Sequence, residues 1–217
     1  MNLYDYILNY ASPFILIIGI FLNALSYNFF GRTSKLLFFY LIGSFLIDLL
    51  ARVFAYYENN NLILWILLSA IELSIFSSLY FLLIKKSVVR ILFLVGICYI
   101  ALEMLFVDTK SISSFQIYSK VVASFLIVLM VLIYLFNYIK SEDRMIWKEL
   151  YLHFIILGYF SLNIIVLLPI NFLINQGSSS AIYIWYVYLI STLTFYIYLT
   201  FYLWKNGKRQ KQLLSGY

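Results

Sequence analysis

The sequence predicts an all-α integral membrane protein, a bundle of seven membrane-spanning helices that forms one domain over residues 1–217. Hydrophobic residues make up 65% of the chain and charged residues 11%, with a mean hydropathy of +0.96, whereas soluble domains carry roughly 25% charged residues. Seven apolar segments reach the length of about 20 residues that a helix needs to cross a bilayer. Each apolar run is continuous rather than alternating, which favours helices over barrel strands.

Polar connections mark the ends of the seven segments. The connections at 31–35, 85–87 and 140–145 are basic, and those that alternate with them are rich in Asn and Ser. The N-terminus has no basic residue before the first apolar run, so it does not resemble a cleavable signal peptide, and we expect the first helix to remain. The expected helices are residues 6–30, 36–57, 62–84, 88–107, 115–139, 146–174 and 181–204.

Lysine and arginine are distributed unequally between the two predicted sides. Of fifteen such residues, twelve lie on the side of the C-terminus, Lys110 and Lys120 lie on the other side, and Arg52 lies within the membrane. The positive-inside rule then places the N-terminus outside and the C-terminus in the cytoplasm. We therefore expect a multi-pass protein of the bacterial inner membrane, with the lipid bilayer as its partner. The twelve are Arg32, Lys35, Lys85, Lys86, Arg90, Lys140, Arg144, Lys148, Lys205, Lys208, Arg209 and Lys211.

A weak internal repeat is present. The second segment matches the sixth at an offset of 115 residues, so that Asp48 corresponds to Asn163. The third matches the seventh at an offset of 120 residues, so that Trp65 corresponds to Trp185. These matches suggest a 3+1+3 plan of parallel repeats around a linking fourth helix, an arrangement that occurs in transporters, with the site near the repeat interface.

Five polar residues lie within the predicted helices and make up the candidate ligand site. A rise of about 1.5 Å per residue places Asp48 and Glu72 near the midplane, Arg52 one turn further out, and Asn163 and Glu103 in the middle and outer membrane. Ionisable groups at this depth are costly and usually functional.

Two interpretations of the five residues stay open. In the first, they only hold the helices together through interhelical contacts. In the second, they form an outward-facing pocket or ion path, which the excess of three acids over one base favours.

Several chemistries lack their residues in this chain. The predicted last helix has no lysine for a retinal Schiff base, and the single histidine, His153, cannot build a zinc site alone. No GxSxG or HExxH motif occurs. We expect no enzyme activity, no catalytic residues, no metal and no cofactor, and the spread of the basic residues argues against a nucleic-acid partner. SWEET-type sugar transporters share the seven-helix 3+1+3 plan, but their Pro-Gln signature is absent.

A looser resemblance covers most of the chain. Its signature runs through Phe38-Phe39-Tyr40-Leu41, Asp48, Asn60-Asn61-Leu62, Trp65, Ile71-Glu72 and Tyr80. The chain thus resembles bacterial seven-helix membrane proteins that are often encoded beside two-component systems. The resemblance implies a sensory context and assigns no catalytic residue.

We therefore expect a membrane protein of receptor or sensor type, with a polar pocket in the outer half of the bundle. A separate signalling partner would act on the cytoplasmic side, because these residues hold no kinase or other output domain. The alternative is a small SWEET-like solute transporter, proton-coupled through Glu72 or Asp48. An intramembrane enzyme is the third interpretation.

Overall fold

The computed structural model describes residues 3–57, 62–106, 118–140 and 147–215, and every element within them is a helix. The predicted connections 58–61, 108–114 and most of 140–145 lie outside the described residues. A short 3-10 helix, η1, covers Tyr27–Phe29. The seven α-helices are α1 (Leu3–Ala24), α2 (Arg32–Tyr57), α3 (Leu62–Ile84), α4 (Ser87–Phe106), α5 (Tyr118–Lys140), α6 (Trp147–Asn175) and α7 (Ser180–Ser215).

The helices are compatible with a multi-pass membrane protein. Each of α2 to α7 contains a segment long and apolar enough to cross a membrane, and α1 is apolar over Tyr10–Ala24. At 1.5 Å per residue, the 20 residues of the shortest helix, α4, span about 30 Å. The prediction of an all-α fold is confirmed, and these helices have the length and apolarity that crossing a membrane requires.

Helix boundaries agree with the prediction in the middle of the chain and differ at its two ends. The first helix ends at Ala24 rather than at residue 30, and η1 follows it. Asn23 lies next to this point. Its side-chain amide donates to the carbonyls of Gly19 and Thr200 and so holds the end of α1 against α7. The last helix continues to Ser215, because Lys, Arg, Gln and Leu beyond residue 204 all favour helix.

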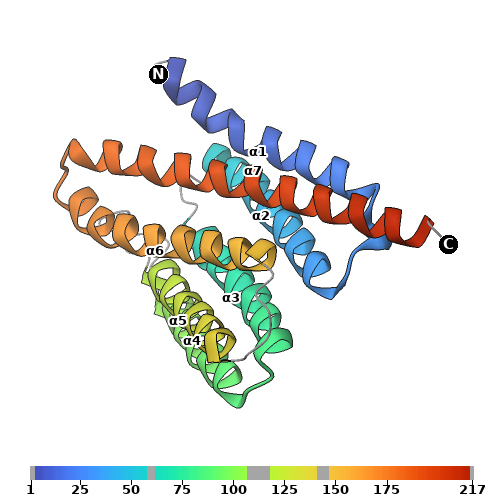
Figure 1. Cartoon of the computed structure of the whole chain (residues 1–217). Helices are drawn as coiled ribbons and strands as arrows, with labels where there is room; N and C mark the ends of the chain where they lie inside the picture. The colour runs from blue at the N-terminus through green and yellow to red at the C-terminus, as the bar shows by residue number, and fades with distance from the viewer. Residues whose placement is uncertain (1–2, 58–61, 107–117, 141–146, 216–217) are drawn as a thin grey trace.

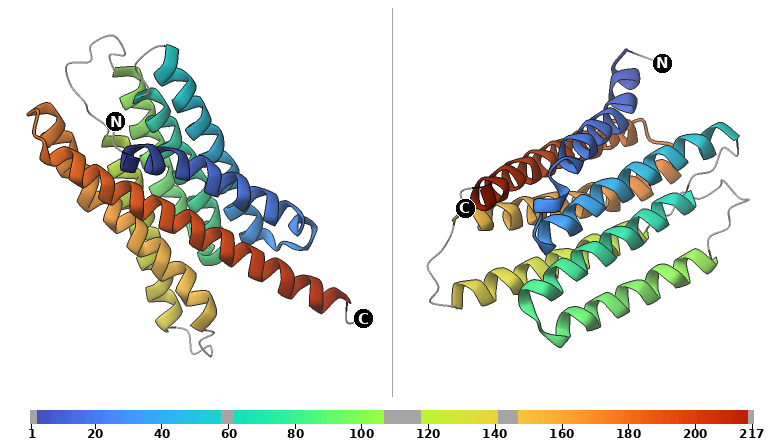
Figure 2. Two further views of the ribbon diagram at one scale, coloured as in Figure 1. Left: turned by 90° about the horizontal axis from the view of Figure 1, so that it is seen from above. Right: turned by 90° about the vertical axis from the view of Figure 1, so that its right-hand side faces the viewer.

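The helices run up and down, so that consecutive helices point in opposite directions along the bundle (Figure 2). The C-terminal ends of α1, α3, α5 and α7 lie at one end, and those of α2, α4 and α6 lie at the other (Figures 1 and 2). Within the bundle α3 packs against α2, α4 and α5, while α6 joins α5 to α7. Helices α1 and α7 lie side by side.

Aromatic side chains fill the centre of the bundle. The Tyr159 and Phe195 rings stack with centroids 4.0 Å apart, and Phe76 meets Phe160 edge-on at 4.9 Å. Tyr40 adds a further edge-on contact to Phe76 at 5.2 Å. All five side chains are buried, so the middle of the bundle is closed by a packed aromatic layer from α2, α3, α6 and α7.

Helix α4 lies at the edge of the bundle and packs closely through Gly96. A Cβ at this position would lie 2.6 Å from Leu126 Cδ1 and would also meet Leu73. A side chain at this position would therefore require the ends of the Leu73 and Leu126 side chains to move.

The helices within each of the two predicted repeat units contact one another in the same order. In each unit the first helix contacts the second and the second contacts the third. The matched residues Trp65 and Trp185 contact each other, with ring centroids 5.4 Å apart. The repeat itself and the membrane orientation stay predictions.

Candidate functional site

Asp48 and Arg52 form an ion pair on one face of α2. The Nε atom of Arg52 lies 3.2 Å from Asp48 Oδ2, and a terminal guanidinium nitrogen donates to Oδ1 at 3.3 Å. The spacing of four residues places both side chains on one face of the helix. The guanidinium also lies over the Tyr10 ring of α1 at 5.7 Å. The side chains are 34% exposed for Arg52 and 25% for Asp48, so both groups stay accessible.

The pair lines a pocket of about 470 Å³ that lies between five helices. A small-molecule site of this kind has a volume of roughly 300–1,000 Å³ and a mostly apolar wall with a few polar groups. The pocket uses the middle of α1, the second half of α2, the first turns of α3, the end of α6 and the first half of α7. It therefore lies toward the end of the bundle opposite the C-terminus. Its lining residues are Ser12, Ser44, Ile47, Asp48, Ala51, Arg52, Ala55, Leu64, Trp65, Leu68, Ile174, Trp185, Tyr188, Leu189, Thr192 and Tyr196.

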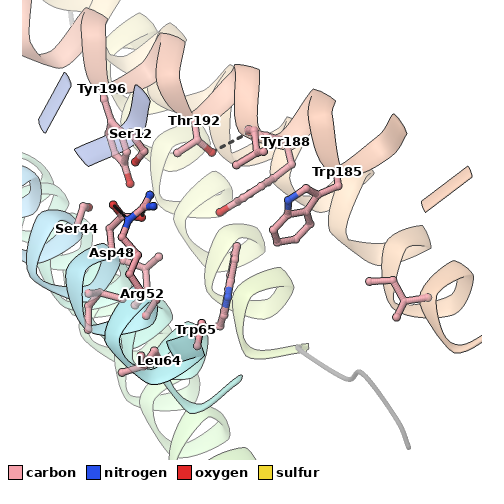
Figure 3. Close-up of a pocket in the computed structure, with 16 residues that line it drawn as sticks. Ser12, Ser44, Asp48, Arg52, Leu64, Trp65, Trp185, Tyr188, Thr192 and Tyr196 are labelled. Carbon is pink, nitrogen blue, oxygen red and sulfur yellow. Dashed lines mark hydrogen bonds and ion pairs between the residues drawn. The ribbon is translucent and has the colours of Figure 1, made fainter. Parts of the chain in front are cut away.

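The pocket has an aromatic side and a polar side. Trp65, Trp185 and Tyr188 contact one another with ring centroids 5.4 to 5.5 Å apart. Figure 3 shows this trio across the pocket from Asp48 and Arg52. Hydroxyl groups of α1, α2 and α7 add further hydrogen-bonding capacity to the lining; they belong to Ser12, Ser44, Tyr188, Thr192 and Tyr196.

Glu72 lies outside this pocket, in a buried ion pair that sequence reasoning missed. Its carboxylate forms an ion pair with the Lys120 ammonium, and the Tyr40 hydroxyl donates to Oε1 at 3.3 Å. Both ionic side chains have 0% exposure. The pair joins α3 to α5, and a buried charge needs such a partner.

Lys120, which the charge count places on the outer side, lies in the first turn of α5 and points into the bundle. It is therefore the buried partner of Glu72 and not an exposed charge. Its position within the predicted helix 115–139 was the one available signal. When Lys120 is counted beside the five predicted residues, three acids stand against two bases, so the excess of acid is smaller than the sequence suggested. Lys110 lies outside the described residues.

Glu103 accepts a hydrogen bond from the backbone amide of Tyr118 at 2.9 Å. Tyr118 is the first residue of α5, whose opening amides lack partners within the helix. A carboxylate there also interacts favourably with the helix dipole. Glu103 therefore caps α5 from the neighbouring helix α4, and it does not line the pocket.

Asn163 is 1% exposed and also lies outside the pocket lining. Neither polar atom of its side-chain amide has a hydrogen-bond partner among the described residues. The five predicted residues are thus separated. Asp48 and Arg52 line the pocket, Glu72 belongs to a buried ion pair with Lys120, Asn163 is buried outside the pocket lining, and Glu103 caps a helix. Whether they bind a ligand stays a prediction.

A second buried polar contact lies nearer the other end of the bundle. His153 Nδ1 and the Tyr80 hydroxyl are 3.1 Å apart, and the Tyr134 ring lies 4.2 Å from the imidazole. These side chains join α3, α5 and α6. Among the described residues, no group of three or more His, Cys, Asp or Glu side chains could hold a metal ion.

Comparison with protein-family models, with curated proteins and with solved structures gives no match for this chain. The pocket and its side chains are therefore the basis for any statement about function.

Proposed function

We propose that this protein is a membrane receptor or sensor that binds a small ligand in the Asp48–Arg52 pocket. The observation that carries the proposal is the pocket itself, where a charged pair faces an aromatic trio across a volume of about 470 Å³. Such a combination of apolar walls with few convergent polar groups is typical of small-molecule sites.

The charge distribution supports an outward-facing pocket. The described residues carry Lys85, Lys86, Lys140 and the basic end of α7 at the end of the bundle where α1, α3, α5 and α7 terminate. Basic residues favour the cytoplasmic side. The pocket lies toward the opposite end, so we place it on the outer side of the inner membrane.

The packed centre of the bundle supports a receptor over a transporter. The aromatic layer of Tyr40, Phe76, Tyr159, Phe160 and Phe195 lies on the side of the pocket that faces the bundle centre. A transporter needs a polar route that opens to both sides in turn. A receptor needs only an outer pocket, and binding there shifts the balance between helix arrangements.

Helix α7 is the element suited to carry a signal across the membrane. It lines the pocket from Trp185 to Tyr196 and continues to Ser215, beyond the predicted membrane boundary. Its basic end would contact anionic lipid or a separate cytoplasmic partner. The resemblance to bacterial seven-helix proteins encoded beside two-component systems agrees with such a partner.

Cysteine labelling tests this proposal, because the chain has a single native cysteine, Cys98. In a Cys98→Ser background, we expect Ala55→Cys in the pocket to react with a membrane-impermeant thiosulfonate in right-side-out vesicles but not in inverted ones. The matched control, Ala123→Cys, should stay unlabelled on both sides because Ala123 is 0% exposed in the core. Labelling of Ala55→Cys from both sides would support a transporter, and labelling from the inside only would refute the orientation.

A further inference from the structure

We propose that the end of α7, together with the start of α2, binds an anionic phospholipid of the inner leaflet. This inference rests on the proposed orientation, and it names the partner of the basic end of α7, which the proposed function leaves open between lipid and protein. Three observations carry it, namely a cluster of cations from two helices, aromatic rings beside those cations, and an exposed apolar stripe that continues along α7.

Two basic segments that are far apart in the sequence lie together. The Asn206 side-chain amide donates to the Ser34 hydroxyl at 2.9 Å, and this bond joins the end of α7 to the first turn of α2. A Cβ at Gly207 would lie 2.7 Å from Ser26 Cβ, so α7 also passes close to the connection between α1 and α2 (Figure 1). Basic residues flank this contact on both helices, and we call them the α2–α7 basic cluster; they are Arg32, Lys35, Lys205, Lys208 and Arg209.

The α2–α7 basic cluster has no acidic counterpart nearby in the sequence. The segments 25–36 and 200–217 contain no Asp or Glu, whereas the basic residues at 140–148 are interspersed with Glu142 and Asp143 and followed by Glu149. Among the side chains that the structure describes, no ion pair involves a member of the cluster. Four of the five side chains are exposed and Lys35 is half-buried. A group of like charges at the membrane surface attracts anionic lipid headgroups.

Aromatic rings hold ammonium groups of the cluster at headgroup depth. Lys208 Nζ lies 3.8 Å from the centre of the Trp204 ring, and Lys35 Nζ lies 5.2 Å from the centre of the Tyr27 ring. A cation within about 6 Å of a ring centre is attracted to its face. Trp and Tyr side chains favour the boundary between hydrocarbon and headgroups. The cations therefore lie at the depth where lipid phosphates are found.

An exposed apolar stripe continues from the cluster toward the middle of α7. Ile197 and Phe201 precede Lys205 at intervals of four residues, so all three side chains lie on one face. Ile197 is 54% exposed, Phe201 is 53% exposed, and Lys205 Nζ lies 5.8 Å from the centre of the Phe201 ring. A phospholipid matches both parts, because its phosphate pairs with the cations and its acyl chain lies along the stripe. An acidic cytoplasmic protein would match the cations alone.

Native mass spectrometry of the purified protein in detergent tests the inference. The probes are phosphatidylglycerol and phosphatidylcholine with identical acyl chains. We expect the protein to bind phosphatidylglycerol with an apparent affinity at least ten-fold higher than phosphatidylcholine, because cations near a membrane surface favour anionic lipid. The triple variant Lys205→Gln, Lys208→Gln and Arg209→Gln should lose most of this preference. Equal binding of the two lipids by the unaltered protein would overturn the inference.

The matched control also removes two lysines and one arginine from the same end of the bundle. It is the triple variant Lys85→Gln, Arg90→Gln and Lys140→Gln, in which all three replaced side chains are exposed. We expect this control to keep the preference for phosphatidylglycerol. An equal loss in the two triple variants would overturn the inference, because binding would then depend on total charge and not on the cluster.

A charge-conserving variant separates charge from folding. Lys205→Arg with Lys208→Arg and Arg209→Lys keeps all three charges, so we expect it to keep the preference for phosphatidylglycerol. Loss of the preference in this variant as well would overturn the role of charge.

A soluble phosphate carries the same charge as the headgroup, so a further arm distinguishes the two sources. Glycerol 1-phosphate has no acyl chain, and we expect a large excess of it to leave bound phosphatidylglycerol in place. Displacement would identify a soluble phosphate as the occupant and overturn the lipid assignment. None of these measurements involves the pocket. If Ala55→Cys is labelled from outside but phosphatidylglycerol is not preferred, this inference fails while the proposed function stands.

Discussion

Replacement of Lys120 by methionine is the sharpest test of the buried ion pair. Lys120 and Glu72 are both fully buried, so Lys120→Met leaves the Glu72 carboxylate without its cation. Removal of one partner of a buried pair costs about 3–5 kcal/mol. The Tyr40 hydroxyl still donates to Glu72 at 3.3 Å, so we expect a loss at the lower end, about 3 kcal/mol.

The double variant Lys120→Met with Glu72→Gln should recover most of this loss. Neutral side chains of similar volume often replace a buried pair without net cost, so we expect recovery of at least about 2 kcal/mol. The free energy of unfolding is measured by titration with sodium dodecyl sulfate in mixed micelles, followed by tryptophan fluorescence. The control is Lys211→Met, because Lys211 is an exposed residue near the end of α7 and surface substitutions change stability by about 0.5 kcal/mol at most.

Two results would refute this reasoning. A loss below about 1 kcal/mol in Lys120→Met would mean that the Lys120 ammonium is solvated by water or lipid headgroups and is not buried against Glu72. A double variant no more stable than the single one would mean that the lysine acts through packing of its side chain and not through its charge.

Two further substitutions test packing and hydrogen bonding in the bundle. Gly96→Ala should destabilise the protein by about 1–3 kcal/mol, because the new Cβ would lie 2.6 Å from Leu126. The control is Gly158→Ala, which has open space around it and should be neutral or stabilising in the same unfolding titration. His153→Phe should lower the free energy of unfolding by about 1–3 kcal/mol, because it leaves the Tyr80 hydroxyl unpaired. Adding Tyr80→Phe removes that hydroxyl and should restore part of the loss. A similar loss in both glycine variants, or no recovery in the histidine–tyrosine double variant, would contradict these two assignments.

The sequence by itself determined the helices and the local ion pair. Long apolar runs predicted helices because a backbone inside the bilayer must make all its hydrogen bonds within the protein. The third helix, Leu62–Ile84, begins and ends where predicted. Apolarity carries no signal for the end of a helix within an apolar run, which is why the turn after Ala24 was missed. The Asp48–Arg52 pair was predictable because both residues lie on one helix, where a spacing of four fixes their neighbourhood.

Only the tertiary structure decided which partners and surroundings the remaining polar residues have. Glu72 and Lys120 lie on α3 and α5, so their pairing depends on which helices pack together and in what rotation. The pocket likewise needs five helices, and its tryptophans come from α3 and α7. Charge and hydropathy specify how each helix relates to the membrane, but helices in lipid choose their neighbours through side-chain packing. That packing separated one predicted cluster into a pocket, a buried pair and a helix cap.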